Sequence, residues 1–241
     1  MKPKKSLGQN FLNDEKTLDN IVDLGDIHND DIILEIGPGT GKLTEKIINK
    51  KPKKIIVVEK DKNLSDALKI NYGHKIEIIN DDILNCYNNF KFDKPIKVFG
   101  NLPYNISTKI LISFLKLDNL DKLFLIFILV FQREVADRIV AKYNTKQYGR
   151  LSILSSWKMN TSKIFDIPPK SFYPVPKVWS SLVFLKPKQK IAKIKYSKSL
   201  EHITNIFFNQ RRKMIKKPIK QIFNNHENIS KKLNLDLTLR P

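Results

Sequence analysis

Short apolar stretches alternate with amphipathic segments along the first 131 residues. Each stretch is rich in Ile, Val, Leu or Phe and has the length of a typical strand. Several of the segments between them place apolar residues at helical spacing. Strands that alternate with helices predict an open α/β sheet whose faces are covered by helices. The predicted strands are residues 31–36, 54–58, 75–79, 96–100 and 123–131.

The next part of the chain predicts an antiparallel end to this sheet. Residues 146–157 indicate a loop followed by a helix. Residues 159–167 and 179–185 then match two strands of a hairpin. The second of these is the last strand that the pattern predicts.

Beyond residue 187 the pattern changes to helices, over residues 197–209 and 219–223. We therefore predict two domains, a large α/β domain of residues 1–187 and a small helical domain of residues 188–241. The chain stops at residues 238–241 with no closing helix, so we expect the second domain to be truncated.

The charge of the chain predicts a polyanionic partner, nucleic acid before membrane. The formal net charge is +20 and the sequence pI is about 9.8. Only 6 of the 44 basic residues are arginine, a bias that a low-GC genome also produces. However, residues 188–241 hold 14 basic and 3 acidic residues, a net +11, which concentrates the excess in the predicted helical domain. This asymmetry favours a nucleic-acid surface over a merely solvated one.

Cysteine content and hydropathy predict a cytoplasmic protein without a metal site. Cys86 is the single cysteine, so the chain can form no disulfide within itself, and no Cys/His spacing typical of a metal site occurs. The basic amino terminus is not followed by the apolar core of a secretory signal. The longest apolar run has nine residues, too few to span a membrane.

Residues 101–104 (Asn-Leu-Pro-Tyr) directly follow the predicted strand 96–100. Ligands of open α/β sheets bind at the carboxyl ends of strands. The Asn101 side chain and the Leu102 carbonyl offer two acceptors that suit an exocyclic NH2 group, and Tyr104 offers a flat face for a base. The simpler alternative is a strand end followed by a proline turn and a helix cap.

Three glycines in residues 37–41 lie at a strand-to-helix turn, which lets a ligand approach the backbone closely. The spacing fits neither a P-loop nor the dinucleotide fingerprint. Glu35, Glu59 and Asp82 lie at the ends of successive strands, where carboxylates can accept ribose hydroxyls or meet an adenine edge. A nucleoside without phosphates fits this pattern best, and S-adenosylmethionine is the usual one.

Four prolines in nine residues, within residues 168–176, exclude the centre of a sheet and predict a rigid loop. We expect this loop to hold Phe172 in the open. A proline-packed hydrophobic corner is the equal alternative.

Six segments in this order resemble the KsgA family of ribosomal RNA adenine dimethyltransferases, across essentially the whole chain. The resemblance implies a Rossmann-like class I methyltransferase domain with a small helical carboxyl-terminal domain. It also implies a reaction in which S-adenosyl-L-methionine, without a metal, dimethylates two adjacent adenosines near the 3′ end of 16S rRNA. The partner implied is small-subunit rRNA within a pre-30S particle, with the enzyme acting as a monomer. The segments are residues 7–12, 35–41, 101–107, 148–152, 172–178 and 208–213.

The resemblance also assigns roles to individual residues. The implied cofactor contacts are Asn10, Leu12, Gly37, Glu59, Asp82 and Asn101. The implied target-base residues are Asn101, Leu102, Pro103, Tyr104 and Phe172, with Tyr104 and Phe172 sandwiching the base. From the charge pattern we add Arg211, Arg212 and Lys213 as RNA-binding residues.

Two alternatives stay open at this point. The first is an Erm-type enzyme acting on large-subunit rRNA, although the segments quoted resemble KsgA more. The second is a ribosome-assembly or transcription factor that keeps the fold without turnover. Pro218 departs from the family pattern and leaves the shape of the RNA-facing helix open.

Overall fold

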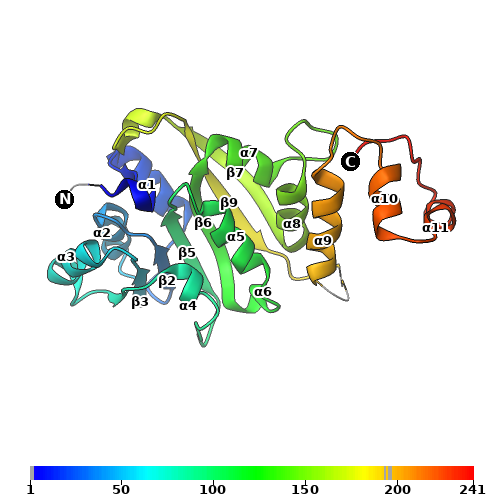
Figure 1. The fold of residues 1–241 in the computed structure, drawn as a ribbon. Helices are drawn as coiled ribbons and strands as arrows, with labels where there is room; N and C mark the ends of the chain where they lie inside the picture. The colour runs from blue at the N-terminus through cyan, green and yellow to red at the C-terminus, as the bar shows by residue number, and fades with distance from the viewer. Residues whose placement is uncertain (1–2, 193, 195–196) are drawn as a thin grey trace.

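A computed structural model describes residues 3–192, 194 and 197–241 (Figure 1). Within these residues, seven strands form the main sheet and two short strands, β1 (Phe11–Leu12) and β8 (Phe172–Tyr173), form a second one. The strands of the main sheet are β2 (Ile32–Ile36), β3 (Lys54–Val58), β4 (Glu77–Ile79), β5 (Ile96–Asn101), β6 (Phe124–Gln132), β7 (Met159–Ile167) and β9 (Ser180–Pro187).

The main sheet has the order β4-β3-β2-β5-β6-β9-β7, with parallel pairing from β4 to β6. The chain winds outward from β2 to β4, then returns to place β5 on the other side of β2. This reversal makes the carboxyl ends of β2 and β5 the topological switch point, where a crevice forms. Antiparallel β7 and β9 confirm the predicted hairpin.

Helices cover both faces of the sheet, because alternate residues of each strand point to opposite sides. Ile33 of β2 packs in one core cluster with α1 and α2, while Leu34 packs in another with α5, α7 and α8. The helices are α1 (Glu15–Leu24), α2 (Lys42–Asn49), α3 (Lys62–Tyr72), α4 (Ile83–Cys86), α5 (Ser107–Leu115), α6 (Leu120–Leu123), α7 (Arg133–Val140), α8 (Arg150–Lys158), α9 (Ser197–Phe208), α10 (Lys216–Ile222) and α11 (His226–Lys232), with 3-10 turns at Lys5–Leu7 and Pro169–Ser171.

The helices after β9 extend away from the sheet. Figure 1 shows α9 beside α8, with α10 and α11 farther out. Pro218 does not interrupt a helix, because it lies in the first turn of α10, where a missing N–H costs nothing. A further helix that the pattern did not predict, α11, follows α10. The division at residue 187 remains a prediction.

The small sheet of β1 and β8 joins two segments that are far apart in the sequence. Phe11 pairs with Tyr173 and Leu12 with Phe172. This pairing brings the amino-terminal arm and the proline-rich loop together at the edge where the crevice opens. Among the described residues, no helix combines the length and the apolar character that crossing a membrane requires.

Candidate active site

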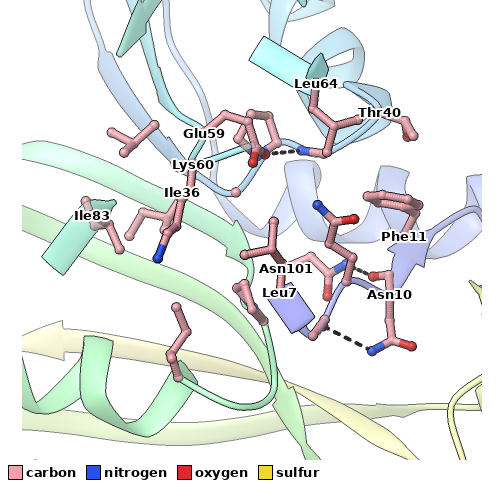
Figure 2. A pocket seen from close by; sticks show the side chains of 18 of the residues that line it. Leu7, Asn10, Phe11, Ile36, Thr40, Glu59, Lys60, Leu64, Ile83 and Asn101 are labelled. Atoms are coloured by element: carbon pink, nitrogen blue, oxygen red, sulfur yellow. Dashed lines mark hydrogen bonds between the residues drawn. The ribbon is translucent and has the colours of Figure 1, made fainter. Parts of the chain in front are cut away.

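A cavity of about 150 Å³ lies at the switch point between β2 and β5, beneath the amino-terminal arm (Figure 2). Residues from the arm, the glycine-rich turn and the ends of β3 and β5 surround it. All of the cofactor contacts implied by the resemblance line this one cavity: Asn10, Leu12, Gly37, Glu59, Asp82 and Asn101. Their proximity agrees with a common ligand, although their roles remain a prediction.

The glycine-rich turn provides backbone that a ligand can approach closely. Gly37, Gly39 and Gly41 all have positive φ values, of 67°, 58° and 84°. A Cβ at Gly37 would meet no atom outside its neighbours closer than 3.9 Å, so its surface is open toward the cavity. A Cβ at Gly39 would instead come within 2.8 Å of the Phe11 ring. Glycine is therefore needed at Gly39 to let the arm close over the turn.

Glu59 lies buried at the base of the cavity, after β3. Its Oε2 accepts from the Gly39 amide at 3.1 Å and its Oε1 accepts from the Asp61 amide at 2.8 Å. Burial raises the pKa of Glu59, and these amides oppose the shift. A carboxylate held in this way keeps lone pairs free to accept ligand hydroxyls, as a ribose site requires.

Glu35 does not belong to the cavity, although it lies at a strand end like Glu59. Its side chain is 1% exposed, is not among the cavity-lining residues and keeps Oε2 without a hydrogen-bond partner among the described residues. Burial raises its pKa to about 8, with a smaller contribution from the charge of Glu59. Of the three strand-end carboxylates, Glu59 and Asp82 line the cavity and Glu35 does not.

Asn101 is held in one orientation by the arm. Its Nδ2 donates to the Asn10 carbonyl at 2.7 Å, and Asn10 in turn donates to the Gly8 carbonyl at 3.3 Å (Figure 2). The Asn101 Oδ1 atom is buried and has no partner among the described residues. A buried acceptor without a donor is costly, so this oxygen is suited to bind a donor brought by a ligand.

The other target-base residues do not all face the cavity. Pro103 lines it, whereas Leu102 is 1% exposed and packs in the core. Tyr104 is partly exposed, and its hydroxyl lies 2.5 Å from the Ser180 hydroxyl oxygen, which ties the ring to the start of β9. The Tyr104 ring is therefore fixed, and its neighbours Pro103 and Asn105 line the cavity while Tyr104 does not.

Phe172 corrects the prediction made from the proline-rich loop. Its side chain is 2% exposed and packs with Leu12 in the core cluster that holds α1. The next residue, Tyr173, is 57% exposed because side chains alternate along a strand. The alternative of a proline-packed hydrophobic corner holds for Phe172, and the loop leaves other aromatic rings in the open.

Asp61 fastens the arm over the cavity, a role that the sequence did not suggest. The Lys4 ammonium donates to its Oδ1 at 2.8 Å and the Gln9 amide donates to its Oδ2 at 3.2 Å. Burial alone would raise the pKa of Asp61, but the hydrogen bonds from Lys4 and Gln9 outweigh it and lower the pKa. A usable signal was that Asp61 follows Glu59 by two residues and caps α3 by accepting from the Asn63 amide.

We expect Asp61→Asn to weaken S-adenosylmethionine binding by about tenfold. The variant keeps an oxygen to cap α3 but loses the charge that pairs with Lys4, at a cost of about 1–2 kcal/mol. Calorimetric titration with the cofactor measures the change. The control is Asp66→Asn, which removes only an exposed pair with Lys62 on α3. Equal affinities for the two variants would contradict a fastening role for Asp61.

The predicted RNA-binding residues lie together after α9, with different surroundings. The Arg211 guanidinium donates to the Lys146 carbonyl at 3.1 Å and lies 5.9 Å from the centre of the Phe208 ring. Arg212 and Lys213 line an open concavity instead. Basic residues that the prediction did not include complete its rim: Lys216, Lys217, Lys220 and Arg240.

Within the described part of the chain, no group of three or more His, Cys, Asp or Glu side chains is arranged to hold a metal ion. The predicted absence of a metal cofactor remains a prediction.

The strand order, the switch point with its glycine turn, and the acidic end of β3 define a class I methyltransferase domain, which confirms the predicted fold class. The chain belongs to the ribosomal RNA adenine dimethylase family, whose model matches residues 1–239.

The relatives of the chain support this assignment. "Ribosomal RNA small subunit methyltransferase A" of Pelagibacter ubique (strain HTCC1062) is 53% identical over 241 residues, which cover 100% of this chain and 92% of that protein. The crystal structure of a dimethyladenosine transferase from Plasmodium falciparum has a TM-score of 0.72 at 26% identity, covering 96% of this chain and 84% of that one. The 23S rRNA methyltransferase ErmE also has a TM-score of 0.72, but at 21% identity, covering 95% and 92%, so this likeness concerns the fold.

Proposed function

We propose that this protein uses S-adenosylmethionine to dimethylate the exocyclic amines of two adjacent adenosines in the 3′-terminal hairpin of small-subunit rRNA. The observation that carries the proposal is the Asn101 Oδ1 atom, which is buried at the cavity, is oriented by the arm and has no hydrogen-bond partner in the part of the chain that the structure describes. The substrate is small-subunit rRNA within a pre-30S particle, and the enzyme acts as a cytoplasmic monomer.

The cavity suits S-adenosylmethionine because its residues match the parts of a nucleoside without phosphates. Glu59 is placed to accept the ribose hydroxyls, and Asp82 lies at the cavity to meet an adenine edge. Gly37 offers open backbone, and Asn10 and Leu12 close the cavity from the arm. The bound cofactor would supply an activated methyl group on a sulfonium sulfur.

Asn101 would activate the amine of the target base. The adenine amine is a poor nucleophile because its lone pair is delocalised into the ring. The amine would donate one hydrogen bond to Asn101 Oδ1 and a second to the Leu102 carbonyl. These two hydrogen bonds would favour a pyramidal nitrogen with a localised lone pair. The proton becomes acidic as the methyl group arrives, so no strong base is needed. Holding the amine in line with the methyl group would supply the rest of the rate acceleration.

The fixed ring of Tyr104 provides a face for a base that has left its stack. Its hydrogen bond to Ser180 fixes the ring, next in the chain to the cavity-lining Pro103 and Asn105. Phe172 is buried in this arrangement, so we assign it to the wall behind the arm rather than to the second side of a sandwich.

One consideration argues against each of the two alternatives, the Erm-type enzyme and the assembly factor. The match to a small-subunit methyltransferase reaches 53% identity over the whole chain, compared with 21% for ErmE. The arm, the glycine turn and Asn101 line one cavity, which supports turnover rather than an assembly factor without it.

The test is transfer of labelled methyl groups to small subunits that lack adenine methylation, compared with protein-free large-subunit rRNA, with product nucleosides identified. Dimethyladenosine in the small-subunit sample alone is the expected result. Methylation of large-subunit rRNA would replace the proposal with the Erm-type activity. Cofactor binding without any transfer would favour the assembly factor.

The basic residues after α9 would dock the RNA backbone. We expect the triple change of Arg211, Arg212 and Lys213 to glutamine to weaken RNA binding. Log affinity should also fall less steeply with log salt, with the slope smaller in magnitude by about 2–3. Binding titrations between low and physiological salt measure the slope. The control is the matching triple change to glutamine of three exposed lysines on the sheet domain. These are Lys53 before β3, Lys69 on α3 and Lys75 before β4. An unchanged slope would mean that Arg211, Arg212 and Lys213 form an ordinary solvated surface that does not contact RNA.

A further inference from the structure

The proline-rich loop exposes a group of apolar side chains. Tyr173, Val175, Val178 and Trp179 are 57%, 65%, 44% and 45% exposed. Four large apolar side chains within seven residues of open surface are more than the scattered exposure normal for a protein. We call residues 173–179 the aromatic segment, because Tyr173 and Trp179 stand at its two ends.

Both ends of the aromatic segment are anchored at the carboxyl edge of the sheet. At the first end, Tyr173 pairs with Phe11, a residue that lines the cofactor cavity. At the second end, the Trp179 carbonyl accepts from the Arg133 amide at 2.9 Å. The next residue, Ser180, holds the Tyr104 hydroxyl. The segment therefore runs from the cavity to the residue proposed to receive the target base.

Positive charge accompanies these rings. Lys170, Lys177 and Arg133 are exposed on or next to the segment. The charge of Arg133 contributes to lowering the pKa of Asp166, but that carboxylate already accepts from Ser181 at 2.6 Å and pairs with Lys163 at 3.3 Å. Exposed aromatic rings flanked by cations are the combination that binds unpaired nucleotides, through stacking and phosphate contacts.

We propose that Tyr173 and Trp179 stack the unpaired nucleotides that flank the target adenosine. This inference rests on the proposed function, since its occupant is the RNA that enters the site. The Trp179 backbone is held by Arg133, one residue before the Ser180 that anchors Tyr104, and this spacing would set the distance between the stacked neighbour and the base on Tyr104. Two adjacent target adenosines require such a neighbour to be held while the other base reacts.

The kinetic test is Trp179→Ala in the full chain. We expect KM for small subunits to rise at least about fivefold, with kcat at saturating subunits and cofactor affinity unchanged. Trp179→Phe should restore most of the loss, because a ring of either kind can stack. Ile70→Ala, an 84% exposed apolar residue on α3, is the control. Values of KM within twofold of the parent for both Trp179→Ala and Tyr173→Ala would overturn the proposal.

A binding test separates this inference from the proposed function. Trp157→Phe leaves Trp179 as the single tryptophan, so its fluorescence reports on the segment without turnover. A single-stranded RNA containing two adjacent adenosines should quench this emission, and the same sequence in a duplex should not. If the RNA did not quench this emission while the variant still methylated subunits, the stacking role would be overturned and the proposed function would stand. If Trp179→Ala weakened binding to intact subunits but not to protein-free RNA, the aromatic segment would instead contact a ribosomal protein.

Discussion

Asn101→Ala is expected to reduce methyl transfer by about 10²–10³-fold while the protein stays folded. The change removes the buried Oδ1 acceptor, and such a loss is typical when one preorganised hydrogen bond to a transition state is deleted. Cofactor affinity should fall less, because Glu59 and Asp82 remain in place. Single-turnover transfer from labelled S-adenosylmethionine to unmethylated small subunits measures the chemical step.

Two further variants sharpen this test. Asn119→Ala changes an exposed asparagine before α6, away from the cavity, and should be indistinguishable from the parent. Asn101→Asp keeps an acceptor oxygen but loses the donor to the Asn10 carbonyl, so an intermediate rate separates activation of the amine from orientation by the arm. A folded Asn101→Ala protein with near-normal turnover would disprove the activating role.

The sheet and most of the cofactor site could be predicted because their signals are local. Buried strands are apolar runs, and a parallel sheet places the ends of those runs at one edge. Gly37 and Glu59 lie directly after such runs and Asp82 lies three residues after the end of β4, so their meeting at one cavity follows from topology. Glu35 precedes the end of its strand by one residue, and the alternation of side chains turns it away from the cavity.

The remaining features depend on contacts between distant segments, which no local pattern encodes. The pairing of β1 with β8 joins residues about 160 positions apart, and it determines that Phe172 is buried while Tyr173 is exposed. The contacts of Asp61 with Lys4 and Gln9 likewise cross more than 50 positions. These contacts assemble the arm over the cavity, so the parts of the site that the sequence missed are those that close it.

The second large effect expected concerns stability rather than turnover, at Glu35. Its pKa is about 8 in the folded protein, compared with an ordinary value of 4.5, and burial is the main cause. Between these values the unfolded chain has released a proton that the folded protein keeps. The free energy of unfolding should therefore fall as pH rises across this window, by up to about 1.4 kcal/mol per pH unit from this group. Below the window both states are protonated and the contribution is absent.

Glu35→Gln is expected to flatten this dependence, because glutamine resembles the protonated carboxyl in shape and cannot ionise. At pH 8 the variant should exceed the parent in free energy of unfolding by a few kcal/mol, and near pH 4.5 the two should be similar. Urea unfolding at a series of pH values measures the difference. Glu134→Gln, which affects only an exposed pair with Arg138 on α7, is the control. Parallel pH profiles for the parent and Glu35→Gln would mean that Glu35 ionises normally in the fold. A flattened profile would mean that Glu35 stays neutral near pH 7.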